Sequence, residues 1–396
     1  MATRIYLDHA ATTPVRPEVR AAMLPFLGDA AFGNPSSSHT PGRAARAAVE
    51  HAREQVARAL GAEPRQVYFT SGGTEADNLA VLGSALARRN DRHSLAAAHL
   101  VSSPTEHKAV LAAVHEAETQ GARATLLPVD RNGVVDLAAL DEALQEHHQP
   151  SLVSVMWVNN EVGTIQPVAE IARRCAAASV PFHTDAVQAF GKVPVDLAAF
   201  PWAAVTVSAH KIGGPKGVGA LVVKDPALFH GLIHGGSQQS GLRPGTENVP
   251  GIVGFGEAAE LAAEEQAAKA TAWAVMRNAL QHAILERVSD AVVHGARAAR
   301  APNILSVSAP GTDSETMLMH LDLAGVAASS GSACLTGAVE PSHVLTAMGV
   351  PPDLAVAAVR FSFGALSTPE QVPQVADAYG RVVTKVRQLR QALARA

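Results

Sequence analysis

From about residue 60 to residue 250, short apolar runs alternate with stretches in which apolar residues recur at helical spacing. The apolar runs predict strands, and the helical stretches predict the helices that connect them. The predicted strands are 66–70, 98–104, 124–130, 151–159, 180–187, 203–207 and 219–225, and the predicted helices are 75–89, 108–120, 137–148 and 168–179. This alternation predicts an α/β fold with a mostly parallel sheet covered by helices on both faces. In such sheets the active site forms where the strands end.

The pattern changes after residue 250, where a long helical stretch covers 251–288 and contains several glycines. It predicts either one long helix or two helices with a break near the glycines. Apolar strands over 303–310 and 358–364 and an amphipathic helix over 370–394 predict a smaller α+β unit. A chain of 396 residues with 47% hydrophobic content is long enough for two domains.

Charge and composition narrow the functional classes. The net charge is -4 and the pI is about 6.5, so nothing in the balance indicates binding to nucleic acid or to an anionic membrane. We find no secretory signal and no apolar stretch near the roughly 20 residues that a membrane span needs. Two distant cysteines do not form a disulfide framework. We therefore expect a soluble cytoplasmic protein with free thiols.

The segment TVSAHKIGGPKGVGALVV carries Ser208, His210 and Lys211 just after a predicted strand. Lys211 is either an exposed turn residue or a Schiff-base lysine held against a bulky cofactor. Asp185 ends another predicted strand 211 − 185 = 26 residues earlier, so both side chains can lie at one edge of the sheet. Alone, a strand-end acid is more often a helix cap. Pyridoxal phosphate (PLP) needs such a pair, because a carboxylate keeps its pyridine nitrogen protonated while a lysine forms the imine.

Residues 71–74 join a predicted strand to a predicted helix in the segment YFTSGGTEADNLA. Free N–H groups at a helix start favour an anion, and Thr74 could add a hydroxyl hydrogen bond. The alternative is an ordinary N-cap in which Thr74 caps the helix and Asp77 follows three residues later. His107 lies after another strand, where it could stack on a ring or transfer protons, or could be an exposed residue at a helix start.

Three further polar residues follow or interrupt apolar strands. Asn159 and Asn160 end one strand, and their amides could bond a ring hydroxyl or a carboxylate. Arg360 lies inside an apolar strand, where a guanidinium is costly unless it meets an anion. That anion could be a substrate carboxylate or a structural Asp or Glu.

The two cysteines have different surroundings. Cys175 lies in VAEIARRCAAASV, whose helical pattern predicts a small buried residue. Cys334 lies in SSGSACLTG, which has no periodic pattern. Taken alone, this stretch favours an incidental loop thiol over a functional one.

Taken together, these segments resemble the cysteine desulfurases, which are PLP enzymes of the class V aminotransferase group with the type I PLP-dependent transferase fold. The resemblance runs in order through YLDHAATTP, FGNPSSSHTPGR, TSGGTEADN, TEHKAV, VNNEVGTIQP, HTDAVQ, SAHKIGGPKG, GLRPGTENV, SGSAC and VRFSFG and covers nearly the whole chain. It is closest to the type with the longer catalytic-cysteine loop. It implies a large PLP-binding domain over 15–260, and a small domain, over 1–14 and 261–396, that carries the cysteine loop.

The resemblance implies a role for each matching residue. Lys211 would form the Schiff base, His107 would stack on the ring and transfer protons, and Cys334 would accept the sulfur. The cofactor contacts would be Gly73, Thr74, His107, Asn160, Asp185, Gln188, Ser208, His210, Lys211 and, from a second subunit, Thr246. The substrate contacts would be Asn34, Asn160 and Arg360. No metal site is implied.

Two positions depart from the usual pattern of this family. Ala209 stands where some members have a second serine, which could remove one hydroxyl from the phosphate site. Leu335 follows the cysteine where Thr or Ser is frequent, which could change loop hydration or contact with a partner.

The implied activity is removal of sulfur from L-cysteine to give L-alanine and a persulfide on Cys334. The implied partners are a second copy of the chain and a sulfur acceptor, such as an iron–sulfur scaffold or a carrier for thiolation of tRNA or cofactors. A selenocysteine lyase or another class V PLP enzyme is the alternative on the same scaffold. An iron–sulfur scaffold or sulfur carrier without catalysis is a third class, but two distant cysteines are too few for a cluster that normally has four ligands.

Overall fold

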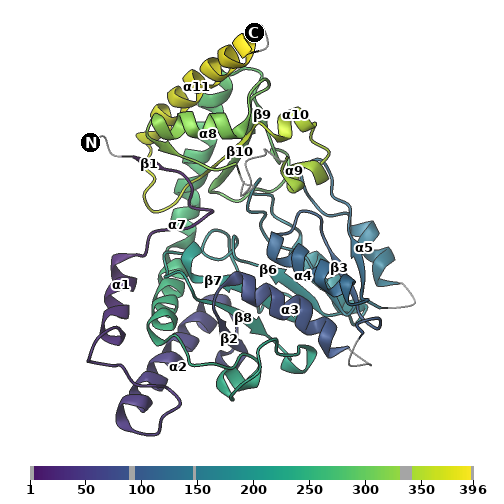
Figure 1. The fold of residues 1–396 in the computed structure, drawn as a ribbon, viewed down its shortest axis with the longest axis vertical. Helices are drawn as coiled ribbons and strands as arrows, with labels where there is room; N and C mark the ends of the chain where they lie inside the picture. The colour runs from purple at the N-terminus through teal and green to yellow at the C-terminus, as the bar shows by residue number, and fades with distance from the viewer. Residues whose placement is uncertain (1–3, 89–93, 146–148, 331–340, 394–396) are drawn as a thin grey trace.

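The computed structural model describes residues 4–88, 94–145, 149–330 and 341–393 (Figure 1). Its larger sheet has seven strands in the order β2-β8-β7-β6-β5-β3-β4. Their bounds are β2 Val67–Thr70, β3 His99–Ser102, β4 Arg123–Leu126, β5 Leu152–Ser154, β6 Phe182–Asp185, β7 Ala204–Ser208 and β8 Gly219–Val223. Only the β2–β8 and β7–β8 pairs are antiparallel. The prediction of a mostly parallel sheet is therefore confirmed.

Helices cover both faces of this sheet, as predicted. On one face α2 (Thr40–Leu60), α5 (Leu137–Leu144), α6 (Val168–Ala177) and the first part of α7 (Val249–Arg287) enclose a core that includes Val222. On the other face α3 (Gly73–Ala87) and α4 (Lys108–Thr119) enclose a core that includes Leu221. Adjacent residues of a strand point to opposite faces, so a strand that is apolar throughout contributes to both cores.

The predicted strand over 151–159 is regular only in β5, although the N–H groups of Val155 and Trp157 still donate to the β6 oxygens of His183 and Asp185. The N–H of Met156 donates to both carboxylate oxygens of the buried Glu106, at 2.9 and 3.0 Å, instead of joining the ladder. The chain thus continues beside β6 as far as Asp185, which ends that strand.

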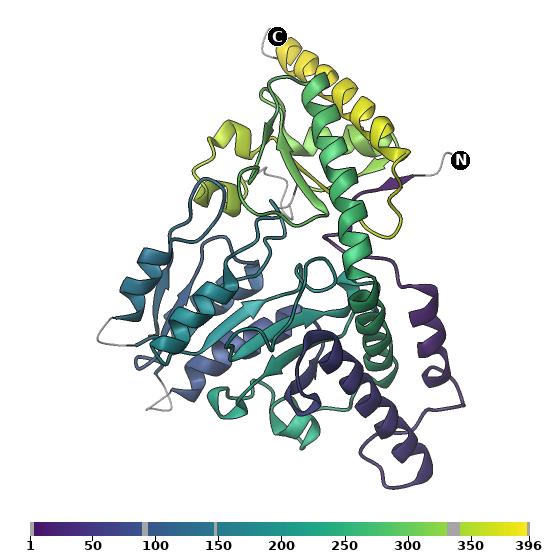
Figure 2. The same ribbon diagram turned by 180° about the vertical axis from the view of Figure 1, so that it is seen from behind.

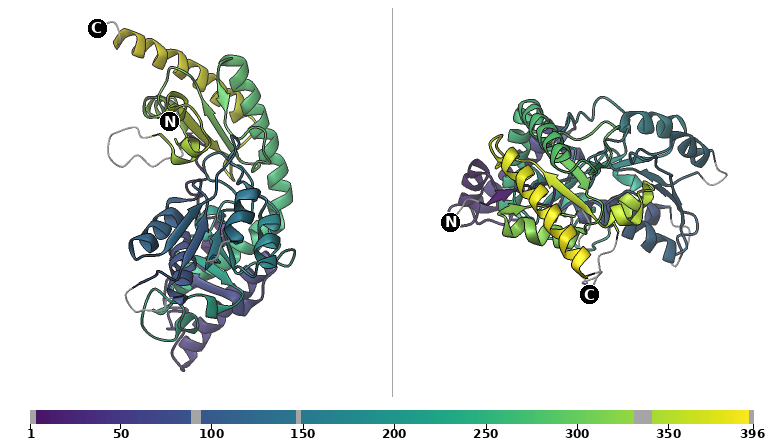
Figure 3. Two further views of the ribbon diagram at one scale, coloured as in Figure 1. Left: turned by 90° about the vertical axis from the view of Figure 1, so that its right-hand side faces the viewer. Right: turned by 90° about the horizontal axis from the view of Figure 1, so that it is seen from above.

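A smaller unit lies at the opposite end of the molecule from α2 (Figures 1 and 3). Its elements are β1 (Ile5–Tyr6), β9 (Val292–Val293), β10 (Ile304–Ser308), α8 (Ser314–Leu323), β11 (Val326–Ala327), α9 (His343–Ala347), α10 (Pro352–Ala355), β12 (Ala358–Ser362) and α11 (Gln371–Leu393). The strands form a β12-β10-β9 sheet and a β1–β11 pair, and Phe361 and Tyr379 lie in the core. The N-terminal strand thus packs with the C-terminal elements. The limits of the two predicted domains stay a prediction.

Helix α7 is one unbroken helix of 39 residues and joins the two parts of the molecule (Figure 2). The break that the glycines of this stretch suggested is absent. A Cβ at Gly256 would lie 2.7 Å from Cα of Ala52 in α2, so this glycine permits close contact between two helices. None of the described helices is long and apolar enough to cross a membrane. Helix α1 (Pro17–Met23) packs against α7.

Candidate active site

A cavity of about 390 Å³ opens where the parallel strands end. It is lined by Ala10, Ala11, Gly73, Thr74, Asp77, His107, Met156, Asn160, Asp185, Val187, Gln188, Ser208, His210, Lys211, Ser329 and Arg360. Ten of the residues predicted from the sequence therefore lie together on one cavity, and two, Asn34 and Thr246, do not line it. Cys334 lies outside the described residues.

Lys211 enters the cavity from the short 3₁₀ turn Ala209–Lys211 that follows β7. Its Nζ donates hydrogen bonds to the carbonyl oxygens of Ala10 and Ala11 at 2.7 and 2.8 Å. Burial, and then the nearby Arg360 guanidinium, lower the pKa of Lys211 to about 8. Lys211 is therefore a partly buried amine at the cavity and not an exposed turn lysine.

Asp185 ends β6, and β6 pairs in parallel with β7, which leads to Lys211. The carboxylate is 5% exposed, and its Oδ1 accepts the N–H of Val187 at 2.8 Å. Burial raises the pKa of Asp185 above its ordinary value. A buried carboxylate in this position is stabilised by a cation such as a protonated pyridine nitrogen.

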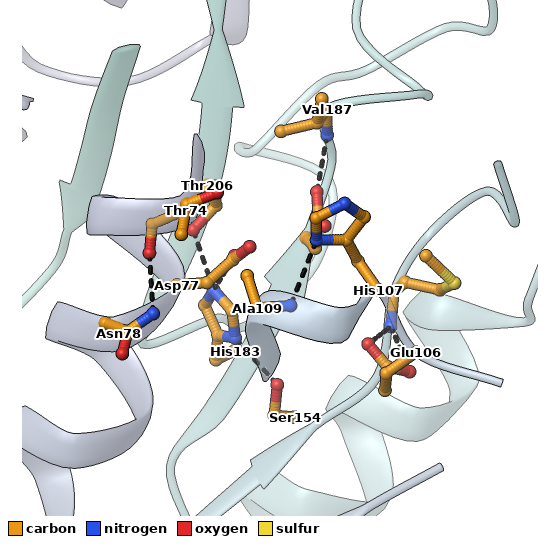
Figure 4. Close-up of polar contacts among 12 residues, drawn as sticks. Thr74, Asp77, Asn78, Glu106, His107, Ala109, Ser154, His183, Val187 and Thr206 are labelled. Atoms are coloured by element: carbon orange, nitrogen blue, oxygen red, sulfur yellow. Dashed lines mark hydrogen bonds and ion pairs between the residues drawn. The ribbon is translucent and has the colours of Figure 1, made fainter. Parts of the chain in front are cut away.

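The sequence prediction missed two buried residues that lie next to each other, Asp77 from α3 and His183 from β6 (Figure 4). Asp77 is 1% exposed, and burial followed by the Asp185 charge raises its pKa well above the ordinary value. His183 Nε2 lies 3.9 Å from Asp77 Oδ1 and 3.0 Å from Thr206 Oγ1. Asp77 had a possible capping role, and His183 lies on a strand with no charged pattern around it, so neither gave a catalytic signal.

The N-terminus of α3 forms one end of the cavity. Its N-cap is Gly72, which has no side-chain capping bond, so the alternative in which Thr74 caps the helix is wrong. Ser208 Oγ is buried and has no hydrogen-bond partner among the described residues. His210 Nδ1 lies 3.1 Å from Thr12 Oγ1 and faces the same end. Free N–H groups and a free hydroxyl at a helix N-terminus suit a phosphate.

His107 is both the N-cap of α4 and a cavity residue (Figure 4). Its Nδ1 accepts the N–H of Ala109 at 3.1 Å, so the neutral ring carries its proton on Nε2. The ring is exposed to the cavity, yet the protein around it limits its hydration, and this desolvation lowers the pKa of His107. The nearby Asp185 charge opposes that shift, while Lys211 and His343 add to it.

Arg360 brings a guanidinium from β12 of the smaller unit into the cavity. It donates to Asp8 Oδ1 and to the backbone oxygen of Asn160, both at 2.8 Å. Its Nε is buried and has no partner within the described part of the chain. The structural acid that the sequence left open is therefore Asp8, and the Nε–H has no acceptor among the described residues.

The neighbouring amide of Asn159 has only a structural role. Its Nδ2 donates to the Thr105 oxygen, and its Oδ1 accepts the N–H groups of Glu161 and Val162. Of the two asparagines, only Asn160 lines the cavity.

Asn34 and Thr246 line a second cavity of about 310 Å³, together with Phe32. Thr246 is exposed, and Phe32 is 73% exposed. Cys175 is fully buried in α6, and burial raises the pKa of its thiol to about 12, which confirms the prediction of a buried residue.

The residues present fit PLP. Three residues that line the cavity carry buried polar atoms with no partner among the described residues, namely Ser208 Oγ, Gln188 Oε1 and Arg360 Nε. These atoms suit, respectively, a phosphate, a ring hydroxyl and a substrate carboxylate. Lys211 and Asp185 would supply the amine and the carboxylate that the aldehyde and the pyridine nitrogen require.

Comparison with known proteins identifies one family, and the related proteins are named for one activity. The model of the class V aminotransferases matches residues 5–375. A cysteine desulfurase IscS from Dictyoglomus turgidum is 44% identical over 387 residues, 98% of this chain and 96% of the relative. A cysteine desulfurase from Sinorhizobium fredii is also 44% identical, over 98% of each chain.

Solved structures agree with these relatives. A NifS-like protein superposes with a TM-score of 0.88 at 35% identity, covering 97% of this chain and 100% of its own. SspA, solved in complex with cysteine, has a TM-score of 0.77 at 33% identity and covers 91% of this chain and 99% of its own. The fold of the chain is thus the type I PLP fold, and its cofactor is PLP. The chain belongs to the class V aminotransferases and, within them, to the cysteine desulfurases.

Proposed function

We propose that this protein removes sulfur from L-cysteine, releases L-alanine and keeps the sulfur as a persulfide on Cys334. The observation that carries the proposal is the single cavity in which Lys211, Asp185 and His107 meet Arg360. When bound there, PLP withdraws electrons from the amino acid and weakens its carbon–sulfur bond.

Arg360 supplies the contact for the carboxylate of the amino acid. Arg360 and Asn160 both line the cavity, Arg360 Nε has no partner among the described residues, and Asp8 holds the guanidinium through a hydrogen bond. The complex of SspA with cysteine, at 33% identity to this chain, supports a site for the same amino acid here.

Lys211 and His107 handle protons near the substrate. With a pKa of about 8, the Lys211 amine loses its proton far more readily than an ordinary lysine, so it can act as a nucleophile and then as a base. Neutral His107 presents Nε2–H to the cavity, because Nδ1 accepts the Ala109 N–H. His107 therefore first acts as a proton donor.

Cys334 accepts the sulfur. Its thiolate attacks the substrate sulfur and forms an S–S bond, the carbon–sulfur bond breaks with its electron pair left on carbon, and a proton completes alanine. Ser329, five residues before Cys334, lines the cavity, and its N–H donates to the Arg360 oxygen at 3.1 Å. This bond holds the chain at the cavity five residues before Cys334, which supports transfer of the sulfur from the cavity to that thiol.

Two copies of the chain form the working enzyme in this proposal. Thr246 is exposed in a Gly- and Pro-rich loop and lies beside Asn34 on a cavity separate from the one that holds Lys211. Leu24, Leu27 and Phe32 are exposed by 58, 64 and 73%. An apolar surface of this kind suits a second protomer, whose phosphate end Thr246 would then reach.

The acceptor of the sulfur is a protein that presents a thiol or a scaffold to Cys334 in the cytoplasm. The large domain (15–260) would hold PLP, and the small domain (1–14 and 261–396) would carry the cysteine to that acceptor. Both statements follow from the resemblance to the cysteine desulfurases.

A coupled assay tests the proposal. Purified holoenzyme receives L-cysteine, and alanine and sulfide are measured with and without a thiol reductant. We expect alanine in both cases, and stoichiometric sulfide only with the reductant, because the persulfide retains the sulfur otherwise. Pyruvate or no amino-acid product would contradict the proposal.

A further inference from the structure

A separate and smaller cavity also has Lys211 in its lining. Its volume is about 50 Å³, and its lining includes His9, Lys192, Asn303, Gly364 and Lys211. Pro14 and Ala365, both exposed, also line it and give it a route to solvent. Lys211 is the only residue that appears in the lining of both this cavity and the larger one described above.

Two residues that line this cavity carry polar atoms without partners in the described part of the chain. His9 is 2% exposed, and neither Nδ1 nor Nε2 has a hydrogen-bond partner. Asn303 is 1% exposed, and its Oδ1 is likewise unpartnered. A Cβ at Gly364 would lie 2.2 Å from the His9 ring, so the backbone of this glycine covers the ring. Buried polar groups are normally satisfied, so these atoms require a partner such as an ordered water or an ion.

Lys192 adds a charge to this cavity. It is 4% exposed, and its Nζ has one long hydrogen bond, 3.4 Å, to the Val187 oxygen. No carboxylate within the described residues pairs with it. Burial, and then the Lys211 charge, lower its pKa to about 7, so much of it is protonated at pH 6.

The other ionisable groups around the cavity do not neutralise Lys192. Arg16 pairs with Glu18 and Glu265, and Lys269 pairs with the same Glu265. The neutral His9 ring, whose pKa burial lowers to about 4, carries no charge. The cavity is lined by four cations, Arg16, Lys192, Lys211 and Lys269, and by no carboxylate of the described residues. Glu18 and Glu265 pair with Arg16 and Lys269, and the charges of Asp185 and Asp8 act on Lys211.

We propose that this cavity binds a small monovalent inorganic anion, such as chloride, between the Lys192 ammonium and the N–H of His9. Water could satisfy the hydrogen bonds but carries no charge to pair with the protonated form of Lys192, whereas an anion does. At about 50 Å³, the cavity has room for a small ion or a few water molecules, each of which needs roughly 10–15 Å³. The bound anion would favour the charged form of Lys192 and reduce its repulsion of Lys211.

Bromide tests the site directly, because its anomalous scattering identifies it. Crystals of holoenzyme in sodium bromide should give an anomalous peak within hydrogen-bond distance of Lys192 Nζ. The peak should vanish in Lys192→Met, which keeps the length of the side chain, and persist in Lys385→Met, which removes an exposed lysine on α11. A cavity that contains only water in the wild type overturns the proposal.

Thermal unfolding tests it in solution. We compare holoenzyme in sodium chloride and in sodium gluconate at equal ionic strength, because gluconate is too large for the cavity. The Tm should be higher in chloride at pH 6, by linkage of binding to stability, and the difference should shrink by more than half at pH 9, where Lys192 is neutral. It should also shrink in Lys192→Met but not in Lys385→Met. Equal Tm values of the wild type in both salts at pH 6 contradict the proposal. This comparison uses the wild-type protein alone.

Discussion

Lys211 shows how the fold sets the chemistry of one residue. Its ordinary pKa of 10.5 would leave an exposed lysine almost fully protonated at neutral pH, and a protonated amine cannot attack an aldehyde. Burial and the Arg360 charge lower that pKa to about 8. Because the folded-state value is the lower one, the unfolded chain binds this proton more tightly, and the contribution of Lys211 to stability improves as the pH rises from about 8 to 10.5.

The rate at which PLP recombines with the apoprotein should therefore rise with pH and level off above about 8. The deprotonated fraction of Lys211 sets the rate, which is followed by absorbance. The reaction of PLP with a free lysine derivative, measured in parallel, corrects for titration of PLP itself. After correction, a midpoint near 10.5 would contradict the lowered pKa, and Lys211→Ala should form no borohydride-stable adduct.

Replacement of each cysteine by alanine should affect sulfide release and stability differently. Cys334→Ala should retain PLP and still shift its spectrum on binding cysteine, yet release almost no sulfide. Cys175→Ala should keep its turnover and lose about 1 kcal/mol of unfolding free energy, because it removes one buried sulfur atom. Mass spectrometry after reaction should find one added sulfur on the Cys334 peptide. Added sulfur on Cys175 would contradict the assignment.

For single residues, the sequence predicts which polar side chains lie at the ends of strands, but not which residues from distant parts of the chain meet. Lys211 and Asp185 follow apolar runs, so their meeting at one edge of the sheet could be predicted. The pairing of Arg360 with Asp8 spans 352 residues of sequence and depends on the packing of the N-terminal segment. The buried Lys192 gave no signal, because its burial comes from tertiary packing and not from a local pattern.

Among the elements, α4 depends on the same histidine that faces the cofactor site. His107 caps the helix through Nδ1, and this tie also fixes the ring. His107→Asn should keep the cap, since Asn is a strong capping residue, but lose proton transfer. His107→Ala should lose both, with a fall of about 1 kcal/mol in unfolding free energy.

Activity and denaturant unfolding of the two His107 variants together distinguish these roles. We expect both to fall well below wild-type turnover, with only the alanine variant destabilised. Near-normal turnover in His107→Asn would show that the ring acts only as a cap.

Helix α7 illustrates where pattern alone misleads. Glycines near its start suggested a break, because glycine disfavours helices. In the structure Gly254 and Gly256 instead allow Met23 and α2 to approach closely. A glycine that breaks a helix and a glycine that permits a close helix contact have the same local sequence pattern. They differ only in what packs against them, and a single sequence does not contain that information.

Gly256→Ala should therefore destabilise the protein although alanine favours a helix. The new Cβ would lie within 2.8 Å of both Cα and Cβ of Ala52, so α2 must shift. We expect a loss of about 1–3 kcal/mol in unfolding free energy, as in other overpacked cores. Gly28→Ala is the control, since a Cβ there meets nothing within 4 Å. Equal stability of the two variants would rule out the close contact.

At the scale of the whole molecule, the cavity depends on both parts of the chain. Arg360 comes from the smaller unit, Lys211 from the larger one, and the N-terminal segment bonds to each, through the Arg360 contact to Asp8 and the Lys211 contacts to Ala10 and Ala11. Within its own chain, Thr246 lines a different cavity from the one that contains Lys211. If a partner chain supplies Thr246, each site contains residues of two protomers.

Hybrid dimers test this arrangement. Lys211→Ala removes the amine, and Thr246→Asp places a carboxylate against the phosphate, so each variant alone should be inactive. A hybrid of the two has one site with neither change, because Lys211 and Thr246 come from opposite chains. An equal mixture refolded together should recover about a quarter of wild-type turnover, since half of the dimers are hybrids with one intact site of two. Sedimentation at the assay concentration confirms the dimer. No recovery, or a fully active monomer, would show that Thr246 does not act across an interface.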